Sequence, residues 1–404
     1  MARAAFQEQL RRSGVVLRSP EALRRIVTAP GELGFARAYV AGDLDIEGDV
    51  YEALELLERR RPLSRLVPGL LPLVLDLGLD ALRPLPAPPE EARLRGCRHS
   101  KVRDAAAIAH HYDVSNRFYR LVLGPSLTYS CAVFADPAAT LEKAQEAKHE
   151  LVACKLGLGE GMRLLDVGCG WGSMLIHAAE RHGVTGVGIT NSRRQAELAR
   201  ERVRAAGLAD RVEIRLADYR DVDDGPYDAI SSIGMVEHVG HAQLDVYFAR
   251  LRALLRPEGR LLNHGIGRPP RRRRLLPRRT FLSRYVFPDG ELQEVGAVAS
   301  RMQAAGLELR HLESLREHYA RTLRHWVRNL ESSWDEAVAE VGSARARIWR
   351  LYMAGSALGF EAGRLQVHQL LAVRPDRGAS GMPLRPGAWR APSREASERA
   401  RSRR

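Results

Sequence analysis

The sequence predicts an α/β fold with a Rossmann-like parallel sheet, preceded by a smaller helical or α+β module. One observation is the run from Arg163 to Ser173, where an apolar, strand-length segment ends in a glycine cluster before an amphipathic segment. Strand, tight turn and helix are expected there, because glycine adopts positive φ and lets the backbone approach a ligand. A second observation is that apolar runs and amphipathic segments alternate beyond this point, as in right-handed βαβ units.

The expected elements follow the chain in order. Strands are predicted at 163–167, 186–189, 212–216, 227–233, 260–265 and 365–373. Helices are predicted at 141–156, 174–182, 192–206, 244–254, 292–305, 319–341 and 344–360. The predicted organisation is a separate module at 1–85, a linker at 86–103, an α/β domain at 104–375 and a basic, disordered tail at 376–404.

Positive charge is concentrated in two stretches. The net charge is +14, and twelve of these charges lie within 268–279 and 376–404. Such stretches favour a polyanionic partner, either an anionic membrane surface or nucleic acid, while a solvated tail is the alternative for 376–404. No uncharged run is long enough to span a bilayer, and the N-terminus lacks the apolar core of a signal peptide.

The cysteines and histidines do not predict a metal site. The four cysteines show no paired metal-ligand spacing and fit a reducing compartment. His110 and His111 are adjacent, which makes them poor joint ligands on one helix face. We therefore expect no metal.

The glycine turn by itself favours a nucleotide-like ligand above the first strand. Its spacing, Gly168-x-Gly170-x-Gly172, is not that of the dinucleotide fingerprint, and a purely structural turn is the alternative. The second strand ends near Thr190 and Gln195, where a dinucleotide-binding domain usually has an acidic residue.

Six ordered motifs resemble those of the cyclopropane-fatty-acyl-phospholipid synthases and mycolic acid cyclopropane synthases. They are HYDVSN at 111–116, TYSC at 128–131, AQEAK at 144–148, DVGCGWG at 166–172, GMVEHVG at 234–240 and RYVFPDGEL at 284–292. The resemblance covers about residues 100–375. It implies a Rossmann-like class I methyltransferase fold and an enzyme that uses S-adenosylmethionine (SAM). By this resemblance, 104–375 is the catalytic domain and 1–85 is an accessory, lipid-associated module.

The resemblance also implies which residues hold the cofactor. Tyr129 and Ser130 are expected to touch its methionine part, and Thr190 and Gln195 to bind its ribose. The loop beneath the ribose and amino acid contains Asp166, Gly168, Gly170 and Gly172, and the pair expected beside the adenine is Asp218 and Tyr219.

The implied reaction is transfer of a methylene group from SAM to the cis double bond of an unsaturated phospholipid acyl chain, which forms a cyclopropane ring. A bound bicarbonate ion is the expected base that deprotonates the carbocation. The matching pocket residues are Cys131, Glu237, His264, Ile266 and Tyr319. The arginines near 268–279, followed by Phe281, Tyr285 and Phe287, predict a basic rim beside an apolar tunnel for a lipid at the cytoplasmic face of the membrane.

Two alternatives stay open. Glu146 is an ionisable residue where related enzymes often carry a neutral one, and in the pocket it would favour a methylene-branched product. A separate flavin-dependent reductase would then be needed as a partner to give a methyl branch. The other alternative is an RNA methyltransferase, although we expect no nucleic acid partner. A homo-oligomer also stays open, and the sequence does not define the double-bond position or head group.

Overall fold

The computed structural model describes residues 8, 10–60, 78, 82–270 and 280–384. They fall into two compact units. Unit 1 contains 1–95, 271–288 and 323–362, and unit 2 contains 96–270, 289–322 and 363–404. This division differs from the predicted boundaries, because two segments of the expected catalytic domain pack with the N-terminal residues. The predicted linker is also divided between the two units at Arg95.

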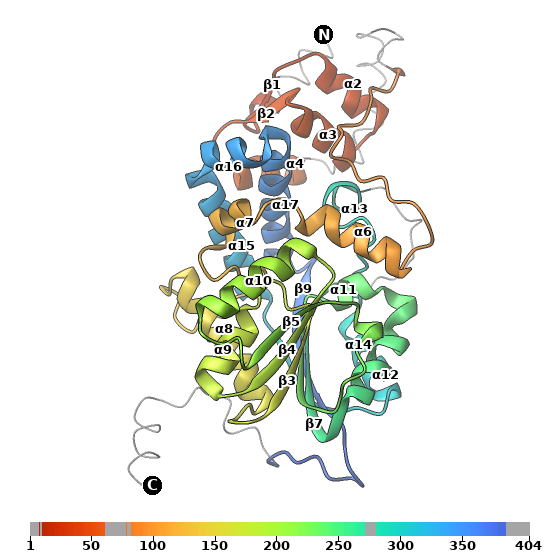
Figure 1. The fold of residues 1–404 in the computed structure, drawn as a ribbon. Helices are drawn as coiled ribbons and strands as arrows, with labels where there is room; N and C mark the ends of the chain where they lie inside the picture. Colours follow the sequence, from red (N-terminus) through yellow and green to blue (C-terminus); the bar gives the residue numbers. More distant parts are fainter. Residues whose placement is uncertain (1–7, 9, 61–77, 79–81, 271–279, 385–404) are drawn as a thin grey trace. The chain divides into compact units, whose positions relative to one another are not determined.

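Unit 2 is built on a seven-stranded sheet in the order β5-β4-β3-β6-β7-β9-β8 (Figure 1). The strands are β3 (Arg163–Val167), β4 (Thr185–Thr190), β5 (Val212–Leu216), β6 (Tyr227–Ile233), β7 (Leu255–Gly267), β8 (Glu308–Ser314) and β9 (Gln366–Val373). β3 to β7 are parallel, whereas β9 runs antiparallel to both β7 and β8. The sheet is therefore parallel as predicted, except at the edge formed by β8 and β9.

Helices cover both faces of this sheet, because the β strands carry apolar side chains on both sides. α8 (Leu141–Leu156), α9 (Ser173–His182) and α10 (Arg193–Ala205) share one core cluster with strand residues such as Leu164. α12 (Leu244–Leu254) and α14 (Val295–Ala304) share the other with residues such as Leu165. The remaining elements of unit 2 are α6 (Lys101–Tyr112), α7 (Asn116–Leu123), η3 (Tyr219–Asp221), α11 (Val236–Val239), η4 (His241–Gln243) and the start of α15 (Arg316–Ser332).

Unit 1 combines N-terminal elements with later helices. It contains the antiparallel pair β1 (Val15–Leu17) and β2 (Leu44–Ile46), together with α2 (Glu21–Thr28), α3 (Glu32–Ala41), α4 (Val50–Arg60), α13 (Phe281–Tyr285), α16 (Trp334–Val341), α17 (Ser343–Glu361) and the end of α15. Arg347 of α17 donates to the backbone oxygens of Tyr39 and Leu44, which joins the late helix to the N-terminal elements. Phe281 and Tyr285, two of the expected tunnel residues, are buried in this unit.

Two elements differ from the prediction. The expected helix 319–341 is two helices, α15 and α16. The edge strand β8 was not predicted, because its side chains are mostly half-buried and polar, without a clear apolar alternation. Most of the two arginine-rich stretches, 268–279 and 376–404, lies outside the described residues, so their expected roles stay predictions.

Candidate active site

A pocket opens in unit 2 at the carboxyl ends of β3, β4 and β6. The empty space inside it is about 900 Å³, part of which is open solvent. Eight of the predicted cofactor-binding residues line it: Tyr129, Ser130, Asp166, Gly168, Gly170, Thr190, Gln195 and Tyr219. Gly172 and Asp218 do not line it; Gly172 caps the start of α9, and Asp218 directly precedes Tyr219.

The glycine loop after β3 forms the floor of this pocket. Gly168 has φ +78°, and the amides of Gly168 and Cys169 both donate to the carbonyl of Ile189, at 3.0 and 2.9 Å. A Cβ added at Gly168 would lie 2.4 Å from the sulfur of Met235. Only glycine therefore fits here without displacing that pocket residue.

Polar side chains at the ends of β3 and β4 are held by hydrogen bonds to side chains of β6 and α10. Asp166 accepts from Ser231 Oγ at 2.6 Å, and burial raises the pKa of its carboxyl to about 6. Thr190 donates to Gln195 Oε1 at 2.8 Å. These neutral and weakly acidic groups provide fixed hydrogen-bonding partners for a ligand with hydroxyl and amino groups.

The pocket also contains residues that the motif analysis did not assign. Lys148 is 2% exposed, and burial lowers the pKa of its ammonium group to about 8, although Asp166 acts against this shift. Tyr112 and His238, joined at 3.3 Å, and Trp171 complete the wall. All four lie within the six sequence motifs, and this position is the feature of the sequence that points to a place in the pocket.

The predicted catalytic residues Cys131, Glu237, His264, Ile266 and Tyr319 do not line this pocket, but a chain of contacts around Ile266 connects four of them. The Ile266 amide donates to Glu237 Oε1 at 2.5 Å, and Ile266 pairs with Val367 across β7 and β9. The Val367 carbonyl accepts from the Leu315 amide. The Leu315 carbonyl accepts from the Tyr319 amide at 3.1 Å and from the Cys131 thiol at 3.6 Å. His264 lies two residues before Ile266 on β7 and pairs with pocket residue Ile233 of β6. The set therefore lies beside the pocket.

Two atoms of this set are buried and lack a hydrogen-bond partner among the described residues: Glu237 Oε2 and His264 Nε2. Burial raises the pKa of Glu237 to about 7 and lowers that of His264 to about 3. A buried polar atom without a partner is costly, and such atoms commonly mark a place where a ligand or water binds.

The tautomer of His264 follows from its neighbours. Lys155 Nζ donates to Gln369 Oε1 at 2.6 Å, which orients the amide so that Gln369 Nε2 faces His264 Nδ1 at 3.2 Å. Because the amide nitrogen donates, Nδ1 accepts and the ring proton of neutral His264 lies on Nε2. The unpartnered Nε2 is therefore a donor.

Cys131 is fully buried, and burial raises the pKa of its thiol far above its ordinary range. A thiol in this environment stays protonated, so it does not act as a nucleophile.

The prediction that Glu146 belongs to the site is wrong. Its carboxylate is on the surface, where it accepts from Arg181 at 3.0 Å and is about half exposed. The inward-facing residues of the same motif are Gln145 and Lys148, which are almost fully buried. The face of α8 that packs on the sheet passes through these positions and leaves Glu146 outside.

The fold and the pocket position define a class I SAM-dependent methyltransferase fold. A solved structure of this class, a mycolic acid cyclopropane synthase complexed with SAH and CTAB, is 34% identical and superposes with a TM-score of 0.62. The match covers 67% of this chain and 98% of that one.

The family model of mycolic acid cyclopropane synthetase matches residues 99–370. The chain therefore belongs to that family. A probable fatty acid methyltransferase of Mycobacterium tuberculosis is 48% identical and covers 92% of this chain and 90% of its own length. The tuberculostearic acid methyltransferase of the same organism is 36% identical, with 90% of this chain and 84% of its own length covered. The predicted family, fold class and enzyme class, a SAM-dependent transferase, are confirmed.

Proposed function

We propose that this chain transfers a methylene group from SAM to the cis double bond of an unsaturated phospholipid acyl chain and forms a cyclopropane ring. The observation that carries the proposal is the pair of unpartnered buried atoms, Glu237 Oε2 and His264 Nε2, beside a pocket suited to SAM. The acceptor comes from α11, which follows β6, and the donor from β7, where the amide of Ile266, two residues after His264, holds the Glu237 carboxylate. An acceptor and a donor suit a bicarbonate ion, which has one O–H donor and several acceptor oxygens.

The groups that bind supply the reactive chemistry: SAM an electrophilic methyl group, and bicarbonate a base. The chain supplies their positions. His264 would donate from Nε2 to the ion, and Glu237 would accept its O–H at Oε2 while the Ile266 amide holds Oε1. Burial of these residues excludes water, which protects a carbocation from hydration.

A second candidate product is a methylene-branched acyl chain. It is favoured by the relatives that match over nearly the whole chain, since one is named a fatty acid methyltransferase and another a tuberculostearic acid methyltransferase. Glu146 no longer supports this candidate, because it lies on the surface. A partner reductase would be needed to complete a methyl branch.

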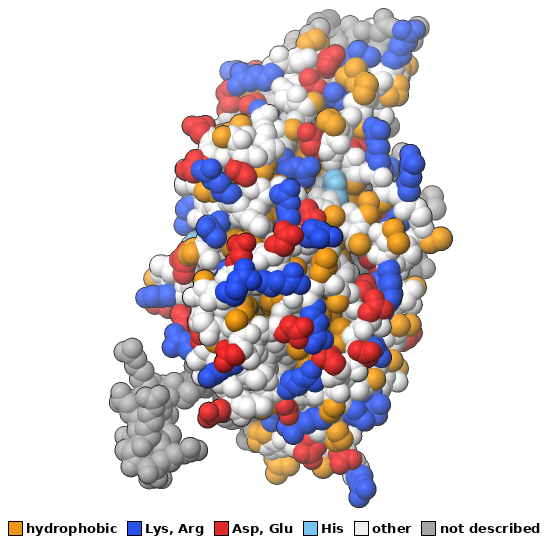
Figure 2. All heavy atoms as spheres, in the orientation of Figure 1, with side chains coloured by type: hydrophobic (Ala, Val, Ile, Leu, Met, Phe, Trp, Pro, Cys, Tyr) orange, Lys and Arg blue, Asp and Glu red, His pale blue; other side chains and the backbone are white. Residues whose placement is uncertain are grey.

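We also propose that the substrate lies at the cytoplasmic face of an anionic membrane. No helix among the described residues is long and apolar enough to cross a membrane. On the face shown in Figure 2, basic and acidic side chains of the described residues are interspersed. The proposal therefore rests on the two arginine-rich stretches of the sequence.

Mass spectrometry of lipids from a host that expresses the chain tests the product. Ring and methylene products have equal masses and must be separated by chromatography. We expect a cyclopropane fatty acid, and a methylene product would replace the first candidate with the second. Incubation with labelled SAM and either unsaturated phospholipid vesicles or RNA tests the substrate class. Label in RNA alone would overturn both lipid products.

A further inference from the structure

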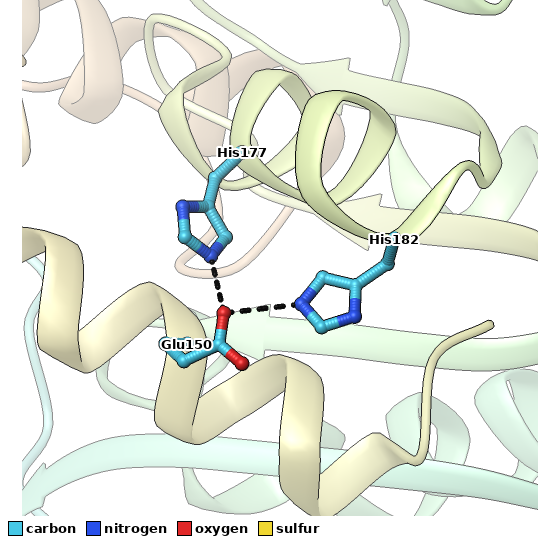
Figure 3. Close-up of side chains that lie close together, drawn as sticks. All are labelled: Glu150, His177 and His182. Carbon is cyan, nitrogen blue, oxygen red and sulfur yellow. Dashed lines mark hydrogen bonds and ion pairs between the residues drawn. The ribbon is translucent and has the colours of Figure 1, made fainter. Parts of the chain in front are cut away.

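Outside the pocket, three potential metal ligands meet between α8 and α9. Glu150 comes from α8, and His177 and His182 come from α9 (Figure 3). Both rings point toward the carboxylate, and each Nε2 lies 3.1 Å from the same oxygen, Oε2. These three side chains are largely buried, with exposed fractions of 26%, 10% and 18%.

We propose that Glu150, His177 and His182 form a structural Zn²⁺ site. Imidazole nitrogen and carboxylate oxygen are common zinc ligands, with metal–ligand distances of about 2.0–2.2 Å. Ligands around a tetrahedral zinc ion are therefore about 3.4 Å apart. The three ligand atoms here lie within 4.8 Å of one another, so small side-chain rotations bring them into range.

A candidate fourth ligand lies on the same helix, although its sulfur is not within 4.8 Å of all three ligand atoms. The Cys154 thiol lies 3.3 Å from the other Glu150 oxygen, Oε1, one helical turn further on. Residues at i and i+4 share a helix face, so a rotation of the Cys154 side chain would bring its thiolate to the ion. A set of two imidazoles, one carboxylate and one thiolate suits Zn²⁺ better than Mg²⁺ or Ca²⁺, which prefer oxygen.

The position of the site assigns it a structural role. Neither the three ligands nor Cys154 lines the cofactor pocket. However, α8 carries the pocket residues Lys148 and His149, and α9 starts directly after the glycine loop. A metal ion that joins these helices would stabilise one wall of the pocket. The alternative is that the three residues form only a hydrogen-bonded cluster and bind no metal. The experiment must distinguish this cluster from a zinc site.

The test uses the full chain after removal of metal with a chelator. Isothermal titration calorimetry with Zn²⁺ should show one equivalent bound per chain. Saturating Zn²⁺ should raise the melting temperature by several degrees. Co²⁺ should give the intense visible absorption of a tetrahedral site. The Cys154→Ser variant should lose the thiolate-to-cobalt band and retain binding with at least tenfold weaker affinity.

The double variant His177→Gln/His182→Gln should lose the bound equivalent and the zinc-dependent rise in melting temperature. Each variant is compared with itself with and without Zn²⁺, so a general loss of stability does not affect the result. Retained SAH binding shows that the variant is folded. Cys97→Ser is the matched control, because Cys97 is an exposed thiol that can bind zinc adventitiously. The proposal is overturned if the wild-type chain binds no stoichiometric Zn²⁺, if the double variant binds it equally well, or if Cys97→Ser abolishes binding.

Discussion

Replacing Glu237 with glutamine tests the assignment of its carboxylate in two independent ways. Glutamine retains an oxygen for the Ile266 amide but loses the negative charge. Catalytic acid–base and orienting groups typically contribute 100-fold or more to turnover. We therefore expect turnover to fall by at least about 100-fold, whereas SAH affinity, measured by calorimetry, stays nearly unchanged, because Glu237 does not line the cofactor pocket.

The same change should alter the dependence of stability on pH. The pKa of Glu237 rises from 4.5 to about 7 in the folded chain, so the unfolded state loses its proton first as pH increases. The native chain therefore loses stability between these two values, by about 3 kcal/mol in total, since one pKa unit corresponds to about 1.4 kcal/mol. Glutamine does not titrate and removes this loss.

Urea unfolding at about pH 5 and about pH 8 measures the effect. Between these two pH values, the free energy of unfolding of the Glu237→Gln variant should rise relative to that of the wild-type chain by most of the about 3 kcal/mol that the wild type loses. Equal pH dependence of the two proteins would refute the raised pKa of the buried Glu237 carboxyl. A loss of SAH affinity as large as the loss of turnover would refute its separation from the cofactor.

Three further substitutions test other parts of the site. Glu146→Gln should leave the ratio of cyclopropane to methylene product unchanged and alter the free energy of unfolding by less than about 0.5 kcal/mol, because it removes only a surface ion pair. A changed ratio in lipid mass spectrometry would contradict the surface position of Glu146. Gly168→Ala should weaken SAH binding at least tenfold in calorimetry, while Gly161→Ala is its control: both residues have φ +78°, but only Gly168 has a neighbour, Met235, in the path of a Cβ. Equal SAH affinities of these two variants would contradict the close approach at Gly168. Gln369→Glu should move the His264 proton to Nδ1, because a carboxylate accepts a hydrogen bond. Turnover should then fall about 100-fold, and the enzyme should need more bicarbonate. Gln369→Met shows the effect of losing the hydrogen bond alone, and unchanged activity of Gln369→Glu would contradict the assigned tautomer.

The pocket was largely predictable from sequence because its residues lie within short motifs. Gly168 directly follows β3 and Thr190 is the last residue of β4, and the ends of parallel strands meet at one edge of a sheet. Glu146 was misplaced because membership of a motif does not define a helix face. The periodicity of α8, in which Ala144, Lys148 and Val152 are buried, contains that information.

The cluster of Glu150, His177 and His182 could not be predicted in the same way. In the sequence, His177 lies 27 residues after Glu150, and His182 lies 32 residues after it. Their meeting depends on how α8 and α9 pack against each other, and no sequence period encodes this. The orientation of Gln369 toward His264 likewise depends on the antiparallel strand β9, whose partner β8 was not recognised.

The composition of unit 1 has a consequence for synthesis on the ribosome. Its first 95 residues emerge early, but 271–288 and 323–362 belong to the same unit. Arg347, which holds the backbone of Tyr39 and Leu44, is made about 300 residues after them. The N-terminal part of the unit must therefore wait, incompletely packed, until residues 323–362 have been translated.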